Sequence, residues 1–219
     1  MIVDERLVTY INSLDTGNTA LLDQIEKEAT EQYVPIIRKE MQTFLKLLLA
    51  MKKPARILEV GTAVGFSALL MAEYNPVPCD ITTIENYEKR IPIARENFRR
   101  AGREAQITLH AGDAADVLKT LDAPYDFIFM DAAKGQYIHF MPEILRLLAE
   151  DGMLVSDNVL QDGDIIESRF AVTRRNRTIH KRMRDYLYEL THSEELVTAV
   201  LPVGDGVTVS TRKSQAALS

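Results

Sequence analysis

Apolar residues recur at helical spacing through the first fifty positions. The first group is Leu7, Tyr10, Ile11 and Leu14, and the second is Leu21, Leu22 and Ile25. This spacing places each group on one face of a helix. The residues at 15–18 between them, Asp-Thr-Gly-Asn, are turn formers. A third helix is expected to start at Val34-Pro35, so the amino-terminal part predicts three helices.

From about residue 56, short β-branched or apolar runs alternate with helical stretches. The runs lie at 56–60, 81–85, 107–110, 127–130 and 153–156. The helices between them are expected near 65–74, 88–101, 114–121 and 137–148. Strands that alternate with helices require crossover connections, which predict a parallel sheet covered by helices on both faces.

The carboxyl-terminal part differs in its connections. A basic helix at about 176–190 is followed by two strand-like runs at 196–201 and 207–212. The stretch PVGDG at 202–206 is too short for a crossover helix, so these runs predict an antiparallel hairpin. The expected fold is α/β, a doubly wound, seven-stranded and mostly parallel sheet with this hairpin at its end. We interpret residues 1–219 as one domain, with 1–53 as helical decoration and 54–213 as its core.

Composition fits this fold and narrows the function. The 219 residues are 46% hydrophobic and 26% charged, with a net charge of −6, which is an ordinary globular balance. RNA binding through the whole surface would need a basic protein, so any RNA contact must come from a local patch. Cys79 is the only cysteine, which excludes an intrachain disulfide and favours a reducing compartment. With no signal-peptide pattern and no apolar run near the ~20 residues of a membrane span, we expect a cytoplasmic protein without membrane contact.

Three features favour a nucleotide-like cofactor at the carboxyl ends of the first three strands. The small residues Gly61, Ala63 and Gly65 follow the first strand and let backbone approach a ligand closely. Glu85 ends the second strand, where an acid can accept hydrogen bonds from both ribose hydroxyls. Asp113 follows the third strand, where its carboxylate could meet an adenine amino group. NAD is disfavoured because its turn needs the spacing G-x-G-x-x-G. Each of the three features, taken alone, could also serve only a turn or a solvated strand end.

Two acids and an amide follow the fourth and fifth strands. Asp131 ends the fourth strand, and Asp157 with Asn158 ends the fifth, so neighbouring strand ends should bring them together. Their oxygens suit Mg²⁺, with water or substrate completing the octahedron, whereas the four scattered histidines argue against zinc. The alternative is that Asp131 caps the next helix and 157–158 forms a turn. Lys134 could accept a proton from a bound hydroxyl, or it is a surface lysine.

These residues resemble the cation-dependent O-methyltransferase family that includes catechol and caffeoyl-coenzyme A O-methyltransferases. The specific stretches are ILEVGTAVGFS at 57–67, IFMDAAKGQY at 128–137, DNVL at 157–160 and LPVGDG at 201–206. The resemblance covers about 34–213. It implies that Asp131, Asp157 and Asn158 bind Mg²⁺ and that Asp131 and Lys134 act in catalysis. The S-adenosylmethionine contacts that it implies are Ile37, Glu59, Gly61, Thr62, Ser67, Glu85, Asp113, Ala114 and Asp131.

Within this family the chain looks most like the small bacterial tRNA 5-hydroxyuridine methyltransferases, which make 5-methoxyuridine at the wobble position. The points of likeness are AAKGQY at 132–137 and the short tail after the hairpin. A basic cluster independently favours phosphate binding. Its members are Arg169, Arg174, Arg175, Arg177, Lys181, Arg182 and Arg184. The candidate RNA contacts are Arg174, Arg175, Arg177 and Lys181, unless the cluster is a solvated helix face paired with the acids at 167, 185 and 189.

Two alternatives stay open beside a tRNA anticodon loop as the acceptor. The first is a small phenolic acceptor, because a catechol and a 5-hydroxyuracil both present two adjacent oxygens that can chelate one Mg²⁺. The second is a noncatalytic cofactor-binding partner protein, which would not need Asp131, Asp157, Asn158 and Lys134 together. Family members are commonly dimers, so a homodimer is expected, with the apolar amino-terminal helices as candidate contacts.

Overall fold

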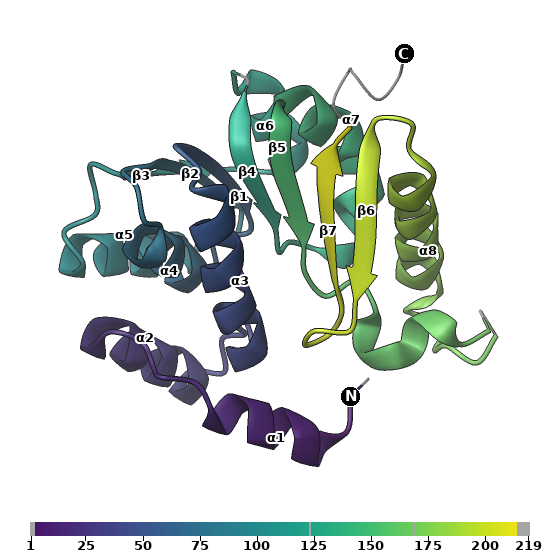
Figure 1. Cartoon of the computed structure of the whole chain (residues 1–219), viewed down its shortest axis with the longest axis horizontal. Helices are drawn as coiled ribbons and strands as arrows, with labels where there is room; N and C mark the ends of the chain where they lie inside the picture. Colours follow the sequence, from purple (N-terminus) through teal and green to yellow (C-terminus); the bar gives the residue numbers. More distant parts are fainter. Residues whose placement is uncertain (1–2, 123, 169, 214–219) are drawn as a thin grey trace.

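A computed structural model describes residues 3–122, 124–168 and 170–213, so Arg169 of the basic cluster lies outside the described residues. Within these ranges, seven strands form one sheet in the spatial order β3-β2-β1-β4-β5-β7-β6 (Figure 1). They are β1 (Arg56–Val60), β2 (Asp80–Glu85), β3 (Ile107–Ala111), β4 (Tyr125–Met130), β5 (Leu148–Ser156), β6 (Leu196–Leu201) and β7 (Val207–Arg212). β1 to β5 run parallel, and β7 is antiparallel to both β5 and β6. The expected mostly parallel sheet and its terminal hairpin are confirmed.

The sheet changes its winding direction beside β1. β2 and β3 are added on one side of β1, and β4 and β5 on the other. In open α/β sheets, ligands bind at the carboxyl ends of the strands at such a point. Val60 lies level with Ile84 and Met130, and Met130 lies level with Ser156. The residues that follow these four positions therefore meet at one edge of the sheet.

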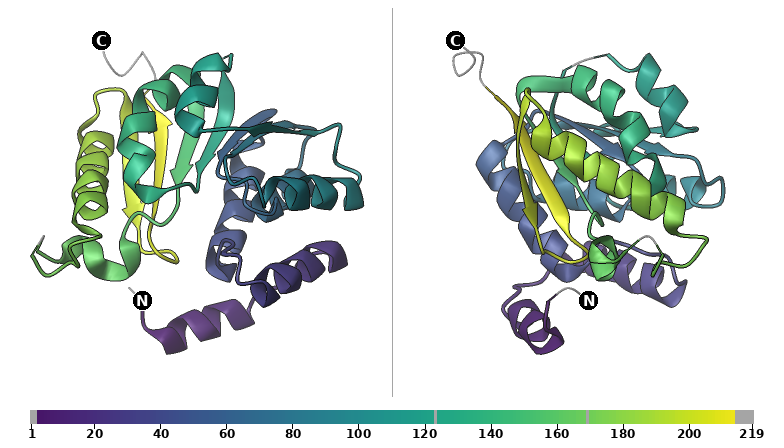
Figure 2. Two further views of the ribbon diagram at one scale, coloured as in Figure 1. Left: turned by 180° about the vertical axis from the view of Figure 1, so that it is seen from behind. Right: turned by 90° about the vertical axis from the view of Figure 1, so that its right-hand side faces the viewer.

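Helices cover both faces of the sheet (Figure 2). One face carries α2 (Ala20–Glu31), α3 (Lys39–Lys52), α4 (Phe66–Tyr74) and α5 (Ile91–Arg100), and the other carries α6 (Ala114–Thr120), α7 (Tyr137–Leu147) and α8 (Arg177–His192). Along β4, Phe127 and Phe129 join the first apolar cluster, while Ile128 and Met130 join the second. This division follows from the alternation of side chains along a strand. In the described ranges, no helix is long and apolar enough to span a lipid bilayer.

The amino-terminal part departs from expectation after its second helix. α1 (Glu5–Ser13) has no buried residue. The next helix after α2 starts at Lys39, so the expected start at Val34-Pro35 is wrong. Residues 34–38, here called the strap, have no regular secondary structure. The ring of Pro35 disfavours the helical conformation at Val34, the residue before it. Pro35 also has no N–H to donate inside a helix. The helix therefore forms only after the strap.

The turn after β1 brings two stretches of backbone close together. Gly61 has a φ of +107°, and a Cβ at this position would lie 2.1 Å from the carbonyl oxygen of Asp131. Gly65, with a φ of +84°, precedes α4, and a Cβ there would lie 2.5 Å from the ring of Phe98. Any side chain at either position would displace its neighbours. Both glycines are therefore required for the shape of the turn.

Candidate active site

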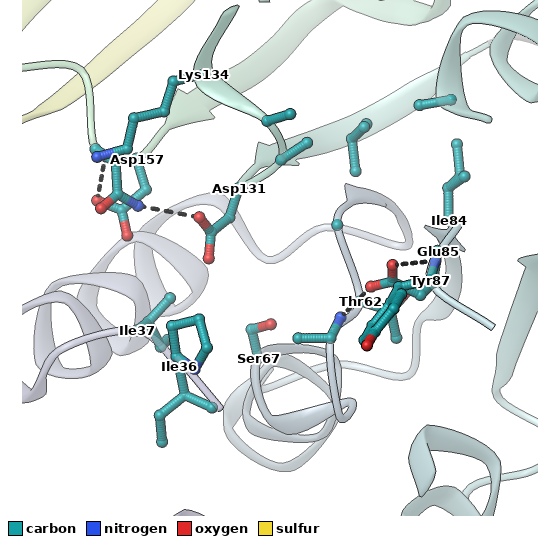
Figure 3. A pocket seen from close by; sticks show the side chains of 18 of the residues that line it. Ile36, Ile37, Thr62, Ser67, Ile84, Glu85, Tyr87, Asp131, Lys134 and Asp157 are labelled. Carbon is teal, nitrogen blue, oxygen red and sulfur yellow. Dashed lines mark hydrogen bonds between the residues drawn. The ribbon is translucent and has the colours of Figure 1, made fainter. Parts of the chain in front are cut away.

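A cavity of about 720 Å³ opens at the carboxyl ends of the parallel strands, bounded on one side by the strap (Figure 3). Ligand pockets commonly have such volumes. All but one of the predicted catalytic, cofactor and metal residues line it, namely Ile37, Gly61, Thr62, Ser67, Glu85, Asp113, Ala114, Asp131, Lys134, Asp157 and Asn158. The expected cofactor residues and the expected metal ligands thus share one cavity. Glu59 is the exception, because it lies outside the lining.

Glu85 is held in place by the backbone around it. Its Oε2 accepts a hydrogen bond from Ala63 N at 2.7 Å, and its Oε1 accepts one from Tyr87 N at 2.8 Å. The residue is 8% exposed, so its carboxylate has a fixed position at the cavity wall. Each carboxylate oxygen can accept more than one hydrogen bond, so both can still receive bonds from ligand hydroxyls. The geometry is compatible with the ribose contact expected from the sequence.

Further residues complete this end of the cavity. Asp113 caps α6, since its Oδ1 accepts a hydrogen bond from Ala115 N at 2.8 Å. Tyr87 and Arg90 also line the cavity, and the Arg90 guanidinium lies 5.3 Å from the centre of the Tyr87 ring. Sequence reasoning missed both residues. Tyr87 could have been found from its position, two residues after the strand-end acid Glu85.

Glu59 lies behind the cavity wall. It is fully buried, and Ser67 Oγ and Thr83 Oγ1 each donate a hydrogen bond to its carboxylate at 2.5 Å. Burial raises the pKa of Glu59 to about 7, against the effect of these two hydrogen bonds. Ser67 in turn lines the cavity. The contact that Glu59 makes with the site is therefore indirect, through the orientation of Ser67.

Asp131, Asp157 and Asn158 come together as the strand order predicts. Asn158 Nδ2 donates to Asp131 Oδ1 at 3.0 Å, and Asp157 Oδ1 accepts from Asn158 N at 2.7 Å. Burial raises the pKa of both carboxyls, and the nearby charge of Asp131 raises the pKa of Asp157 further. The N-cap position of η1 is Ala133, so Asp131 does not cap the next helix as the alternative predicts. Among the described residues, no three His, Cys, Asp or Glu side chains are placed so that they could hold a metal ion, so a metal here would depend on the Asn158 amide as well.

Asp205 is a residue of this cluster to which the sequence assigned no role. It lies in the β6–β7 turn, is 9% exposed and lines the cavity. Its Oδ2 lies 4.0 Å from Lys134 Nζ, and Arg38 of the strap is also paired with it. Burial and a hydrogen bond with Asp162 raise the pKa of Asp205. Asp205 therefore adds a third buried carboxyl to this end of the cavity.

Lys134 lies in η1 (Lys134–Gln136), directly after β4. Its side chain is 34% exposed and extends toward Asp157 in Figure 3. It is therefore part of the cavity wall and not a lysine on the open surface. Its amine and the acid cluster face the same space, and its role in accepting a proton stays a prediction.

The basic cluster lies beside this catalytic end. Arg182 Nη1 donates to the carbonyl oxygen of Gly135 in η1 at 3.2 Å, which fixes the start of α8 next to Lys134. Arg177 lies over the ring of Phe170, and Lys181 pairs with Asp185 at 2.6 Å, as the solvated-helix alternative predicts. Arg174 and Arg175 are exposed, and within the described part of the chain neither forms a salt bridge. Among the described members of the basic cluster, these two arginines are exposed and free of salt bridges, so both are available to a ligand.

This sheet order, the acid at the end of β2 and the shared cavity define a Rossmann-like methyltransferase. A family model described as O-methyltransferase matches residues 12–213. The chain belongs to the O-methyltransferase family.

Two relatives illustrate this membership. The chain is 35% identical over 128 residues to a catechol O-methyltransferase from Niastella koreensis. The matched region covers 57% of this chain and 58% of that protein. It is 30% identical over 183 residues to caffeoyl-CoA O-methyltransferase 2 from Populus trichocarpa, covering 77% of this chain and 71% of the relative.

Solved structures agree with the fold. A putative caffeoyl-CoA O-methyltransferase from Staphylococcus aureus superposes with a TM-score of 0.87 at 29% identity, covering 96% of this chain and all of that one. An SAH-bound methyltransferase from Podospora anserina superposes with a TM-score of 0.86 at 28% identity, covering 96% of this chain and 95% of that one.

Proposed function

We propose that this protein transfers a methyl group from S-adenosylmethionine to a hydroxyl of an acceptor with two neighbouring oxygens, with the help of a divalent cation. The observation that carries the proposal is a single cavity with Glu85 on one wall and the acids Asp131 and Asp157 on another. Membership of the O-methyltransferase family and the SAH-bound relative support the methyl donor.

The residues at the acid cluster fit a divalent cation. Asp131 and Asp157 supply carboxylate oxygens, and Asn158 supplies an amide oxygen if its amide rotates away from the present bond to Asp131. Mg²⁺ prefers such an all-oxygen set. Burial raises the pKa of both carboxyls, and the charge of Asp131 raises that of Asp157 further. A bound dication would favour the ionised form of both groups, and it would supply Lewis acidity to the acceptor oxygens.

The other residues place the reactants and move one proton. Glu85 holds the nucleoside end of the methyl donor, and the Gly61 turn lets the backbone approach it. Lys134 accepts the proton of the acceptor hydroxyl, and the resulting oxyanion takes the methyl group from the sulfonium. Ile37 and Ser67 wall the cavity between the two ends. Alignment of this kind contributes up to about 7–11 kcal/mol in well-oriented reactions.

We propose 5-hydroxyuridine at the wobble position of tRNA as the acceptor. The exposed Arg174 and Arg175 beside η1 support a phosphate-binding rim, with Arg177 and Lys181 as further candidates. A catechol or a caffeoyl-CoA-type phenol is the second candidate. The names of the relatives favour it, and it would present the same pair of oxygens.

The decisive test is methyl transfer with defined acceptors. Purified protein and isotopically labelled S-adenosylmethionine would be incubated with tRNA from a strain that lacks the gene, or with catechol or caffeoyl-CoA. Mass spectrometry of the products is expected to show labelled 5-methoxyuridine, with loss of the signal in EDTA and recovery with Mg²⁺. Label on the phenols and none on tRNA would establish the second candidate. No label on any acceptor would refute the proposed activity.

A further inference from the structure

Arg38 of the strap forms ion pairs across the mouth of the cavity. Its guanidinium Nη2 lies 2.5 Å from Asp205 Oδ1 and 3.2 Å from Asp162 Oδ1. Asp205 belongs to the β6–β7 turn, and Asp162 belongs to η2 (Gln161–Ile166), which follows β5. The stem of Arg38 also packs near Gly204, where a Cβ would lie 3.8 Å from Arg38 Cδ. The strap is thereby joined to elements more than a hundred residues further along the chain.

The inner side of the strap is attached in a different way. Gln42 of α3 is 1% exposed, and its Nε2 donates to the carbonyl oxygen of Ile37 at 3.1 Å and to Glu26 Oε1 at 3.1 Å. Its Oε1 accepts a hydrogen bond from Asn18 Nδ2 at 2.8 Å. These buried bonds fix the strap to the amino-terminal helices. They cannot hold it against the strand ends on the far side of the cavity.

The far side offers a fixed anchor. Leu160 N donates to the carbonyl oxygen of Asp205 at 2.9 Å, and Val159 N donates to that of Gly206 at 2.9 Å. A Cβ at Gly206 would lie 2.2 Å from the Leu160 side chain, so the two turns are in tight contact. Asp162 and Asp205, the two acids that pair with Arg38, therefore belong to segments that are packed together. The ion pairs of Arg38 set the distance between the strap and these segments.

We propose that Arg38 is a positioning residue that closes the strap over the bound methyl donor, with Asp162 and Asp205 as its anchor. The inference rests on the proposed function, because it takes the cavity as the site of S-adenosylmethionine. Closure keeps Ile37, which lines the cavity, against the ligand. The Arg38 side chain is 40% exposed and that of Asp162 is 51% exposed, so this outer pair contributes little to fold stability, whereas the Asp205 side chain, 11% exposed, lies deeper.

The test measures how fast S-adenosylhomocysteine, the product form of the donor, leaves the protein. Stopped-flow dissociation would compare the wild type with Arg38→Gln, Arg38→Lys and Arg100→Gln. We expect the dissociation rate to rise about tenfold in Arg38→Gln and less in Arg38→Lys, because the ammonium keeps the positive charge but lacks the planar guanidinium geometry. In the wild type, added salt should accelerate release, and in Arg38→Gln it should have little effect.

Arg100→Gln is the matched control. Arg100 pairs with Glu28 at 2.7 Å and joins α2 to α5, but it does not line the cavity. Its replacement removes a comparable arginine–carboxylate pair between the amino-terminal helices and the core. We expect an unchanged dissociation rate in this variant. A rate increased as much as in Arg38→Gln would show a general loosening of the helices and overturn the assignment.

A double-mutant cycle with Asp162→Asn completes the experiment. If Arg38 acts through its anchor, the double variant should release the ligand no faster than Arg38→Gln alone. Additive effects, or dissociation from Arg38→Gln at the wild-type rate, would overturn the proposal. Failure of the wild type to bind S-adenosylhomocysteine at all would instead refute the proposed function, so the two failures are distinguishable.

Discussion

Glu59 should make the protein less stable as pH rises, and replacing it with glutamine should remove that dependence. Burial raises the pKa of this carboxyl from an ordinary 4.5 to about 7 in the folded protein. Between these values the unfolded chain has lost the proton while the folded protein still holds it. Stability therefore falls as pH rises from about 4.5 and levels off above about 7.

The size of the effect follows from the pKa difference. Each pKa unit corresponds to about 1.4 kcal/mol, so the full loss is about 3 kcal/mol. Glu59→Gln keeps a side chain of the same shape that can still accept one hydrogen bond from Ser67 or Thr83, but it cannot ionise. Relative to the wild type, the variant should gain about 3 kcal/mol in free energy of unfolding between pH 4.5 and pH 8. For a chain of this size the midpoint of thermal unfolding should shift by roughly 6–12 °C.

Urea unfolding at several pH values, without metal or cofactor, would measure the effect. The comparison is between the wild type and the variant at each pH, because the other buried acids contribute equally to both. Glu104→Gln, at an exposed position, controls for the removal of one negative charge. A wild-type-minus-variant difference that stays constant within about 1 kcal/mol from pH 5 to pH 8 would refute the reasoning. Glu59 would then ionise in the folded protein without cost.

Three further predictions concern the site. Glu85→Ala should weaken S-adenosylmethionine binding by roughly a hundredfold or more by calorimetry, since two charge-assisted hydrogen bonds are each worth ~1.5–3 kcal/mol; unchanged affinity would place the nucleoside elsewhere. Asp157→Ala should abolish turnover and Mg²⁺-induced stabilisation while circular dichroism and cofactor affinity stay near wild type, and normal activity after chelation would contradict the metal assignment. Replacing Arg174, Arg175 and Arg177 with glutamine should weaken tRNA binding and reduce its salt slope by about 0.7–0.9 for each phosphate that the protein no longer neutralises, without affecting catechol methylation; an equal decrease on both acceptors would assign these arginines to the fold.

The sheet could be predicted because its signals are local. Each parallel strand is a short apolar run, and the turn residues between strands and helices are visible in the sequence, so the bounds differ from those observed by only a few residues. The same reasoning placed Glu85, Asp131 and Asp157 at strand ends. Their convergence then followed from the parallel arrangement alone, without any knowledge of side-chain contacts.

The sequence could not predict which strand-end acids are buried or which distant segments of the chain pack together. Nothing local distinguishes Glu59, which is fully buried behind the wall, from Glu85, which lines the cavity, because both are acids near the end of a strand. The sequence predicts that the third helix starts at Val34-Pro35, within the strap. Ile36 and Ile37 instead pack in the cavity wall and the cluster beneath it, which are built by residues much further along the chain.

Asp205 was within reach of a topological argument. α8 connects β5 to β6 on one face of the sheet, and a helical crossover of this kind returns the chain in the same direction. β6 must then run parallel to β5. The structure agrees, because β7 pairs antiparallel with both β5 and β6. The turn after β6 therefore has to lie at the carboxyl edge, beside Asp131 and Asp157. An acid in the stretch LPVGDG at 201–206 is consequently a site residue by position, and the hairpin completes the active site as well as ending the sheet.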